Sequence, residues 1–235
     1  MKLALIGYGA MGKLVEALAK AEGHEVSRAF TSRDAARGVE ALAEALRGHD
    51  AAIDFSVAGA VRTNVESCLR AQVPLVEGTT GWNKELEDVR RMVDERGGAL
   101  LYGANFSIGV NLFFRVVAHA AELFGAVDSY EPFIEEAHHS RKRDAPSGTA
   151  LKLRDIVGQH SKGDISVAST RAGQIAGTHR VGFDSLADQV LLTHMALSRE
   201  GFAAGALLAA RWIAGKRGVY EFTEAIDEIL KERKR

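Results

Sequence analysis

The chain has little cysteine, little proline and no surplus of charge. Its 235 residues include one Cys and three Pro, and 30 Lys and Arg residues balance 31 Asp and Glu residues. Cys68 alone permits neither an intrachain disulfide nor a cysteine zinc site, which favours a reducing compartment. The balanced charge argues against a general nucleic-acid binder, so we expect no nucleic-acid partner.

Long apolar runs are also missing. Met1 and Lys2 lead into an apolar segment that is too short for a signal peptide, and no apolar run reaches membrane-spanning length. No repeat, low-complexity segment or proline-rich linker interrupts the chain. With 46% hydrophobic and 26% charged residues, we expect an ordinary globular protein of the cytoplasm, with one large or two small cores and no membrane partner.

A glycine-rich turn stands between a strand pattern and a helix pattern at the start of the chain. The apolar residues 3–6 precede Gly7-Tyr8-Gly9-Ala10-Met11-Gly12, and residues 13–20 have helical spacing. In a dinucleotide-binding fold the first glycine allows a tight turn, the second lets the pyrophosphate approach, and the third lets helix and strand pack closely. A purely structural turn is the alternative, but the strand–turn–helix order favours a dinucleotide site.

Strand and helix patterns alternate up to Ser107. We expect strands at 25–30, 51–56, 73–77 and 99–103, and helices at 39–46, 61–71 and 85–96. This alternation specifies a parallel, right-handed α/β sheet, the Rossmann arrangement. Ligands of such sheets lie outside the carboxyl ends of the strands, so Phe55 and Ser56 are candidates for cofactor contacts, as is the loop Gly78-Thr79-Thr80-Gly81.

The end of the second strand bears on the choice of cofactor. A domain that prefers NAD usually has an acid about twenty residues beyond the last glycine, whereas Thr31, Ser32 and Arg33 stand in that region here. Hydroxyls and a guanidinium can bind a 2′-phosphate that an acid would repel, so we expect NADPH to be preferred and NADH to be possible. Two alternatives stay open: a helix cap with an exposed Arg, and Asp34 reaching the ribose.

The pattern changes after Ser107. We expect helices at 110–124, 151–158, 202–212 and 222–231, and strands at 130–139, 165–168, 177–183 and 187–195. These elements predict a smaller α+β domain over 108–212, for substrate binding and oligomerisation, beside a dinucleotide-binding domain over 1–107. The C-terminal helices at about 213–235 would return to the first domain. An open sheet usually needs a partner.

Two adjacent imidazoles and a cationic run precede a turn into a helix. His138 or His139 can supply a proton near neutral pH, and Lys142 can act as a fixed cation or, if desolvated, as an acid. Ser147 is a good N-cap, and the helix start after it would present amide groups to a carboxylate, from Gly148 and Thr149. The alternative is a solvated basic loop before a helix.

Residues 136–150 resemble, position by position, the motif Glu-Ala-His-His-x-x-Lys-x-Asp-Ala-Pro-Ser-Gly-Thr-Ala. It is typical of the 4-hydroxy-tetrahydrodipicolinate reductases (dihydrodipicolinate reductases) of lysine and diaminopimelate biosynthesis. The segments 78–81, 104–107 and 171–179 extend the resemblance over nearly the whole chain. The family more often has Arg where this chain has Ala10, which removes one possible phosphate contact.

The resemblance implies reduction of a cyclic imine dicarboxylate by hydride from NAD(P)H, in a homotetramer assembled through the second domain. His138 would be the proton donor or acceptor and Lys142 the second proton donor, while substrate would be bound by His139, Ser147, Gly148 and Thr149. The residues alone do not assign the roles of the two imidazoles, and a hydroxylated or a dehydrated substrate is possible. Arg171 and His179 are weaker candidates, with surface charges as the alternative.

The expected cofactor contacts come from all the strand ends of the first domain, and no metal is expected. They are Gly7, Tyr8, Gly9, Ala10, Met11, Gly12, Thr31, Ser32, Arg33, Phe55, Ser56, Gly78, Thr79, Thr80, Gly103, Ala104, Asn105 and Phe106. One rival is another Rossmann dehydrogenase that acts on a semialdehyde or keto acid, but acyl chemistry needs a nucleophilic Cys and Cys68 lies within a helix pattern. A second rival is a non-catalytic dinucleotide sensor. Such a protein need not keep His138, His139 and Lys142, yet all three are present.

Overall fold

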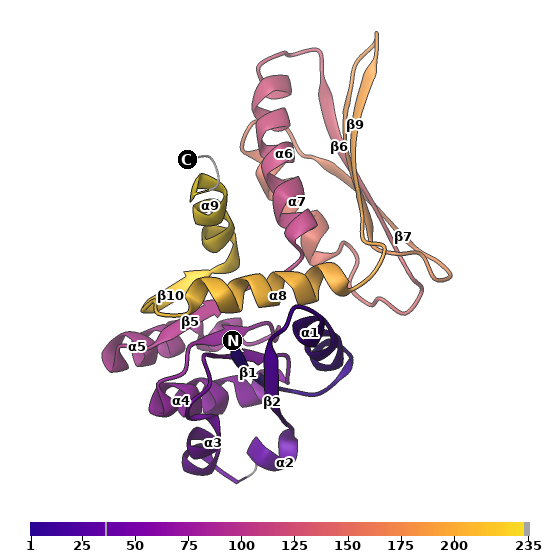
Figure 1. Cartoon of the computed structure of the whole chain (residues 1–235). Coiled ribbons are helices and arrows are strands. Elements are labelled where there is room, and N and C mark those ends of the chain that lie inside the picture. Colours follow the sequence, from indigo (N-terminus) through magenta and orange to yellow (C-terminus); the bar gives the residue numbers. More distant parts are fainter. Residues whose placement is uncertain (36, 233–235) are drawn as a thin grey trace. The chain divides into compact units, whose positions relative to one another are not determined.

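A computed structural model describes residues 1–35 and 37–232, and the chain forms two compact units (Figure 1). Unit 1 comprises Met1–Ile108 and Arg199–Arg235, and unit 2 comprises Gly109–Ser198. Each unit contains buried hydrophobic clusters of its own.

Unit 1 is built on a six-stranded, fully parallel sheet in the order β10-β5-β4-β3-β1-β2. The central strands are short and almost continuously buried, as expected of a parallel sheet with both faces covered. The strand order reverses at β1, which pairs with both β2 and β3. The strands are β1 (Lys2–Ile6), β2 (Glu25–Phe30), β3 (Ala51–Asp54), β4 (Leu75–Glu77), β5 (Ala99–Tyr102) and β10 (Gly218–Glu221).

Helices cover both faces of this sheet, and β1 shows how the sequence divides them. Leu3 and Leu5 point to the side packed by α1, α8 and α9, whereas Ala4 and Ile6 point to the side packed by α3, α4 and α5. The helices are α1 (Ala10–Ala21), α2 (Ser32–Ala35), α3 (Val39–Leu46), α4 (Val61–Ala71), α5 (Leu86–Arg96), α8 (Glu200–Ile213) and α9 (Phe222–Glu232), with single 3₁₀ turns η1 (Ala58–Ala60) and η2 (Asn83–Glu85). Unit 1 is thus the predicted Rossmann fold.

Helix α8 corrects the predicted domain boundary. The sequence placed 202–212 in the second domain, but α8 buries Ala203, Ala206 and Leu207 in the core of unit 1. Its small residues allow a close approach, and a Cβ at Gly205 would lie 1.7 Å from the carbonyl oxygen of Phe106. The boundary therefore falls after Ser198, and the segment that follows returns to the sheet.

Two smaller differences concern strands. The strand expected over 51–56 ends at Asp54, which leaves Phe55 and Ser56 in the following loop. Strand β10 was missed, because four residues with only two apolar side chains, Val219 and Tyr220, give too short a pattern.

Unit 2 has a mixed four-stranded sheet in the order β7-β6-β8-β9, and the predicted open sheet is confirmed. Its strands are β6 (Glu131–His138), β7 (Ser166–Arg171), β8 (Thr178–Asp184) and β9 (Gln189–Met195), and its helices are α6 (Ile108–Gly125) and α7 (Gly148–Gly158). Ile134 and Val181 of the sheet share a buried cluster with α6 and α7. On the alternate positions, Leu191 and Met195 remain 46% and 51% exposed.

Helix α6 contradicts the expectation that no apolar segment is long enough to span a membrane. Its 18 residues, with a mean hydropathy of 1.3, are long and apolar enough to cross a membrane, and 28% of them are buried within the protein. Phe113, Val117 and Ala121 of this helix pack in the core of unit 2. One side of α6 therefore packs in the core of unit 2, and most of its residues are not fully buried.

Candidate functional site

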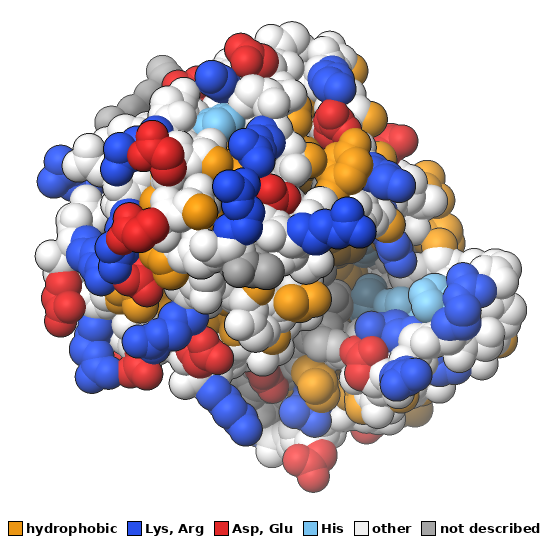
Figure 2. All heavy atoms as spheres, turned by 90° about the horizontal axis from the view of Figure 1, so that it is seen from below, with side chains coloured by type: hydrophobic (Ala, Val, Ile, Leu, Met, Phe, Trp, Pro, Cys, Tyr) orange, Lys and Arg blue, Asp and Glu red, His pale blue; other side chains and the backbone are white. Residues whose placement is uncertain are grey.

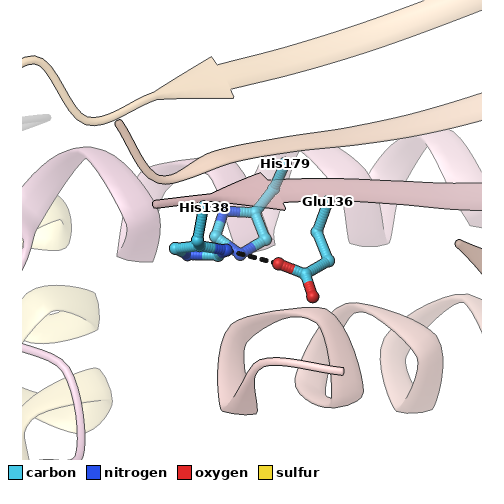
Figure 3. A group of neighbouring side chains, drawn as sticks. All are labelled: Glu136, His138 and His179. Carbon is cyan, nitrogen blue, oxygen red and sulfur yellow. Dashed lines mark hydrogen bonds and ion pairs between the residues drawn. The ribbon is translucent and has the colours of Figure 1, made fainter. Parts of the chain in front are cut away.

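The site in unit 2 is organised around the carboxylate of Glu136, whose side chain is fully covered. Arg171 Nη2 lies 2.6 Å from Oε1, and His138 Nδ1 is bonded to Oε2 (Figure 3). The strands bring these groups together: Glu136 pairs in register with His179 of β8, and His138 pairs with Arg171 of β7. The amide of Ser147 completes the set by donating to Oε1 over 3.3 Å.

Glu136 is held as a carboxylate. Burial alone would raise its pKa, but hydrogen bonds from Arg171 and Ser169, with the nearby His138, lower the pKa below the ordinary value. A buried acid in this state needs such partners, since an unpaired buried charge is very costly. The Glu136 carboxylate therefore places a fixed negative charge beside Nδ1 of His138.

His138 is neutral in the free protein at neutral pH. Burial lowers its pKa, and Lys142 and Arg171 act in the same direction, while Glu136 opposes them. Because Nδ1 faces an ionised carboxylate, the single proton of the neutral ring sits on Nδ1. Nε2 is then the atom that can gain or lose a proton. It lies close to the backbone at Gly177, where a Cβ would be 3.1 Å away.

His179 and Ser147 form the inner side of the cluster. His179 is 4% exposed, and burial, aided by His138, lowers its pKa to about 4. Its Nε2 lies 3.0 Å from Ser147 Oγ, which also accepts the amide of Ala150 over 3.2 Å and so caps α7. The predicted N-cap is confirmed, and it fixes the helix start against the sheet.

Lys142 lies in the loop that joins β6 to α7. Its ammonium is 2.8 Å from Asp144 Oδ1, and its amide donates to the carbonyl of His139 over 3.1 Å. Lys142 lowers the pKa of Asp144. Arg171 Nη2 also donates to the carbonyl of Asp144 over 2.5 Å, which ties the loop to β7. The loop thus carries a cation near His138 and suits an anionic ligand.

Three of these side chains have the composition of a metal site, because ligand atoms of Glu136, His138 and His179 lie within 4.8 Å of one another. The charges beside them disfavour a dication. Arg171 is within 2.6 Å of the same carboxylate, and Lys142 is near enough to lower the pKa of His138. The donor set fits a hydrogen-bonded proton-transfer cluster better than a zinc centre.

The structure brings some predicted residues together and revises others. His138 and Ser147 bond Glu136, and Lys142 lies in the adjoining loop, near enough to lower the pKa of His138. Glu136 was not among the predicted site residues; its signal was a charged residue at a core-facing position of the strand. Both polar groups of Ser147 are engaged within the cluster, so its binding of substrate stays a prediction. His139 has a buried Nδ1 that no described residue bonds. Its role, like those of Gly148 and Thr149 in the first turn of α7, also stays a prediction.

Arg171 and His179 are not surface charges, and that alternative was wrong. The side chain of Arg171 is 16% exposed and bonded to Glu136, and His179 is buried against Ser147. On the face shown in Figure 2, His side chains lie beside Lys and Arg side chains, with acidic groups interspersed. The near-zero net charge of the chain therefore does not reveal that imidazoles and cations gather on this face.

The glycine motif of unit 1 has the geometry expected of a dinucleotide turn. Gly7 has a φ of +83°, and a Cβ there would lie 2.5 Å from the Phe55 carbonyl oxygen. A Cβ at Gly12 would lie 2.3 Å from the Gly7 oxygen, so the third glycine allows close packing of helix and strand. No described atom lies within 4 Å of a Cβ at Gly9, which leaves room at the start of α1.

Other predicted cofactor residues lie at the carboxyl ends of the same strands. The Phe55 ring packs on Gly78, where a Cβ would be 2.2 Å from it, and the amide of Ser56 bonds Thr79 Oγ1 over 3.1 Å. Phe106 is 2% exposed, and the centroid of its ring lies 4.6 Å from that of Phe222. Its side chain is therefore covered, and only its backbone remains for a ligand. Tyr8 is 37% exposed and bonded to Glu16.

The turn after β2 is stabilised by Asp34. Its Oδ2 accepts the amide and the hydroxyl of Thr31 over 2.8 and 3.1 Å, and its Oδ1 lies 3.2 Å from Arg28. Hydrogen bonds from Thr31, first among these interactions, lower the pKa of Asp34. Ser32 and Arg33 are exposed at the start of α2. The polar groups of Thr31 are therefore already engaged.

Comparisons with known proteins agree over nearly the whole chain. Residues 1–106 match a family model described as dihydrodipicolinate reductase, N-terminus, and residues 109–226 match its C-terminus counterpart. The 4-hydroxy-tetrahydrodipicolinate reductase of Christiangramia forsetii is 34% identical over 250 aligned positions, which cover 98% of this chain and 100% of the relative. That of Archaeoglobus fulgidus is 34% identical, with 97% and 100% covered.

A solved structure confirms the fold. It is a dipicolinate-bound dihydrodipicolinate reductase from Paenisporosarcina sp. TG-14, with a TM-score of 0.77 and 20% sequence identity. The match covers 94% of this chain and 97% of that one.

Proposed function

The chain belongs to the dihydrodipicolinate reductase family, and on that premise we propose that it uses NADPH to reduce 4-hydroxy-tetrahydrodipicolinate, or its dehydrated form, to tetrahydrodipicolinate. Membership makes it an oxidoreductase of lysine and diaminopimelate biosynthesis that depends on a nicotinamide dinucleotide. The residue assignments rest on the hydrogen bond that His138 Nδ1 donates to Glu136, because this bond leaves Nε2 as the proton-exchanging atom.

In this proposal the bound substrate promotes protonation of His138, which then serves as the acid. His138 is neutral in the free protein, and a dicarboxylate bound beside it would favour the imidazolium, because an opposite charge within a few ångströms stabilises the charged form. Nε2 would then donate the proton that the substrate takes up after reduction. Glu136, still bonded to Nδ1, would stabilise the imidazolium and keep the ring oriented.

Lys142 is proposed as the second proton donor. Asp144 holds its ammonium at 2.8 Å in the free protein, on the same loop that leads to the start of α7. A substrate carboxylate would compete with Asp144 for this cation. Arg171 would take little part in direct binding, since its Nη2 is already bonded to Glu136 and to the carbonyl of Asp144.

The bound dinucleotide would supply the hydride. Gly7, Gly9 and Gly12 fit it, since the first and third make the tight turn and the second leaves open space at the N-terminus of α1. We propose that NADPH is preferred because Ser32 and Arg33 are exposed where the 2′-phosphate would lie. Asp34 uses both carboxylate oxygens within the turn, which disfavours its role as a ribose acceptor.

A homotetramer in the cytoplasm is also proposed. The sheet of unit 2 has one helix-free face on which Leu191 and Met195 are about half exposed, and such a face is stabilised by a second copy.

Cys68 is 2% exposed, and burial raises the pKa of its thiol well above the usual value. A buried thiol of this kind is no nucleophile, which counts against the semialdehyde alternative.

The test is an absorbance assay of cofactor oxidation with freshly generated substrate, run in parallel with NADPH and NADH. Turnover with NADPH supports the proposal. Tight NADPH binding without turnover would instead support the non-catalytic dinucleotide sensor.

A further inference from the structure

Two acids are completely buried under the loops that follow β3 and β4. Asp54 and Glu77 end these neighbouring strands, pair in register, and are both 0% exposed. We propose that they share one proton, and that this acid–carboxylate pair is a positioning device which holds the two cofactor-binding loops together. The inference rests on the dinucleotide site proposed above, because it assigns these loops to the cofactor.

Asp54 has the hydrogen bonds of a carboxylate. Its Oδ1 accepts the amide of Ser56 over 2.7 Å, and its Oδ2 accepts Nδ2 of Asn64 over 2.6 Å. The same Asn64 nitrogen lies 3.2 Å from Ser56 Oγ, so the carboxylate and α4 both fix the loop after β3. Two donors on two oxygens leave Asp54 ready to accept one more proton but not to supply one.

Glu77 has the hydrogen-bond pattern of a protonated carboxylic acid. Its Oε1 accepts the amide of Thr79 over 2.7 Å, whereas its buried Oε2 accepts no bond from the described residues. A buried carboxylate oxygen without a donor is costly, and a proton there removes the cost. Burial, and then the neighbouring Asp54, raise the pKa of Glu77 well above its usual value, and burial also raises that of Asp54.

The described residues around the pair supply no positive charge. From α4 the pair is faced by the Cys68 thiol, whose own pKa is raised, first by burial and then by the two acids. From β5 the register partner of Glu77 is Tyr102, and from β1 the partner of Asp54 is Ile6. Among the described residues, no Lys, Arg or His lies within ion-pair distance of either acid. One negative charge is therefore the state that this pocket can hold.

The pair acts on both loops through their backbones. It bonds the amides of Ser56 and Thr79, and the amide of Ser56 also bonds Thr79 Oγ1 over 3.1 Å. Loss of the shared proton at alkaline pH would leave two adjacent buried charges, whose repulsion would separate the strand ends. Dinucleotide affinity should therefore fall as pH rises, before the fold itself is lost.

The experiment measures NADPH affinity by fluorescence titration from neutral to alkaline pH, for the wild type, Glu77→Gln and Glu87→Gln. The side-chain amide that Glu77→Gln introduces can replace the shared proton with an N–H group, so we expect near-wild-type affinity at neutral pH and a much weaker decline at alkaline pH. Glu87 is an exposed acid on α5, and its variant should behave as the wild type does. Asp54→Asn, which sets an amide against the existing donors, should bind NADPH about tenfold more weakly.

A second measurement does not depend on cofactor binding. The infrared spectrum of the wild type at neutral pH should contain the carbonyl band of a protonated carboxylic acid, and Glu77→Gln should lack it. Absence of this band in the wild type, or equal alkaline declines in the wild type and Glu77→Gln, would overturn the shared proton. If the wild type bound neither NADPH nor NADH while keeping the band, the proposed cofactor site would fail and the shared proton would stand.

Discussion

The carboxylate of Glu136 is bonded to Nδ1 of His138, two residues further along the same strand. Residues two apart in a strand point to the same face, and here the face is covered by α7. Arg171 holds the other carboxylate oxygen at 2.6 Å, so the orientation of Glu136 is fixed from β7. The tautomer of His138 therefore depends on a residue that need not touch the substrate.

Glu136→Gln tests this dependence. Glu136 raises the pKa of His138, so its neutralisation lowers that pKa further and leaves Arg171 unpaired beside the ring. We expect the turnover number to fall about tenfold or more, by the usual scale for general acid catalysis. Because His138 must be protonated to act, activity is lost as pH rises through its pKa, and the alkaline limb should move to lower pH.

Glu135→Gln is the matched control, because Glu135 is exposed on the opposite face of the same strand, where it pairs with Arg180. Its pH–rate profile should coincide with that of the wild type. A normal profile for Glu136→Gln would remove Glu136 from the mechanism.

Arg33→Ala tests the choice of cofactor. The loss of one partly exposed, charge-assisted contact with the 2′-phosphate should cost about one to three kcal/mol. The Michaelis constant for NADPH should then rise roughly tenfold or more, with that for NADH nearly unchanged. Thr31→Asp should go further, since its carboxylate would repel the phosphate. It would also lose the hydroxyl bond to Asp34.

Arg47→Ala serves as the control, because Arg47 is an exposed cation of the same unit, 2.9 Å from Glu44. Equal shifts for the two cofactors in both test variants would mean that Arg33 and Thr31 only shape the turn. The preference would then belong to a main-chain contact or to Asp34.

His179 links stability to pH. Its pKa is lowered from 6.5 to about 4 in the fold, so between these values the unfolded chain binds more protons than the folded one. The contribution of His179 to the free energy of unfolding is fully present above pH 6.5. It is lost as pH falls toward 4, which lowers the free energy of unfolding by up to about 3 kcal/mol. Calorimetry of His179→Gln should show a smaller fall of Tm over this window. His119→Gln, on an exposed side chain of α6, should keep the wild-type slope.

The sequence predicted the elements of the Rossmann sheet well, because each is marked locally. The strand over 25–30 and the helices over 39–46 and 61–71 have the predicted bounds, since apolar periodicity and flanking glycines act over short distances. Helix α8 was assigned to the wrong unit because a helix of small apolar residues carries no information about which core it joins.

The site was only partly predictable. His138, Lys142 and Ser147 stand within ten residues of one another, so a motif reveals them together. Glu136 and Arg171 are 35 residues apart, and only strand pairing shows that one compensates the other. The same holds for Asp54 and Glu77, where each acid alone looks like an ordinary polar strand end. Burial of a charge depends on partners, which sequence spacing does not reveal.

Subunit assembly can be tested by sedimentation at micromolar concentration, where we expect a tetramer. Leu191→Asp puts a charge on the open face of the sheet, where the wild-type side chain is 46% exposed, and should yield smaller species. Leu123→Asp, 57% exposed on α6, is the control and should sediment as the wild type does. A wild type that is monomeric and fully active at this concentration would contradict the proposal.

The proposed reaction and the role of Lys142 are tested by the turnover number for NADPH oxidation with freshly generated 4-hydroxy-tetrahydrodipicolinate, compared between the wild type, Lys142→Ala and Lys162→Ala. Lys162 is a matched control because it also pairs with an aspartate, Asp128 at 2.7 Å, in a loop of the same unit. We expect turnover by the wild type and Lys162→Ala, and a loss of at least about a hundredfold in Lys142→Ala with near-normal NADPH affinity. Wild-type turnover in Lys142→Ala, or none in the wild type despite bound NADPH, would contradict the proposal.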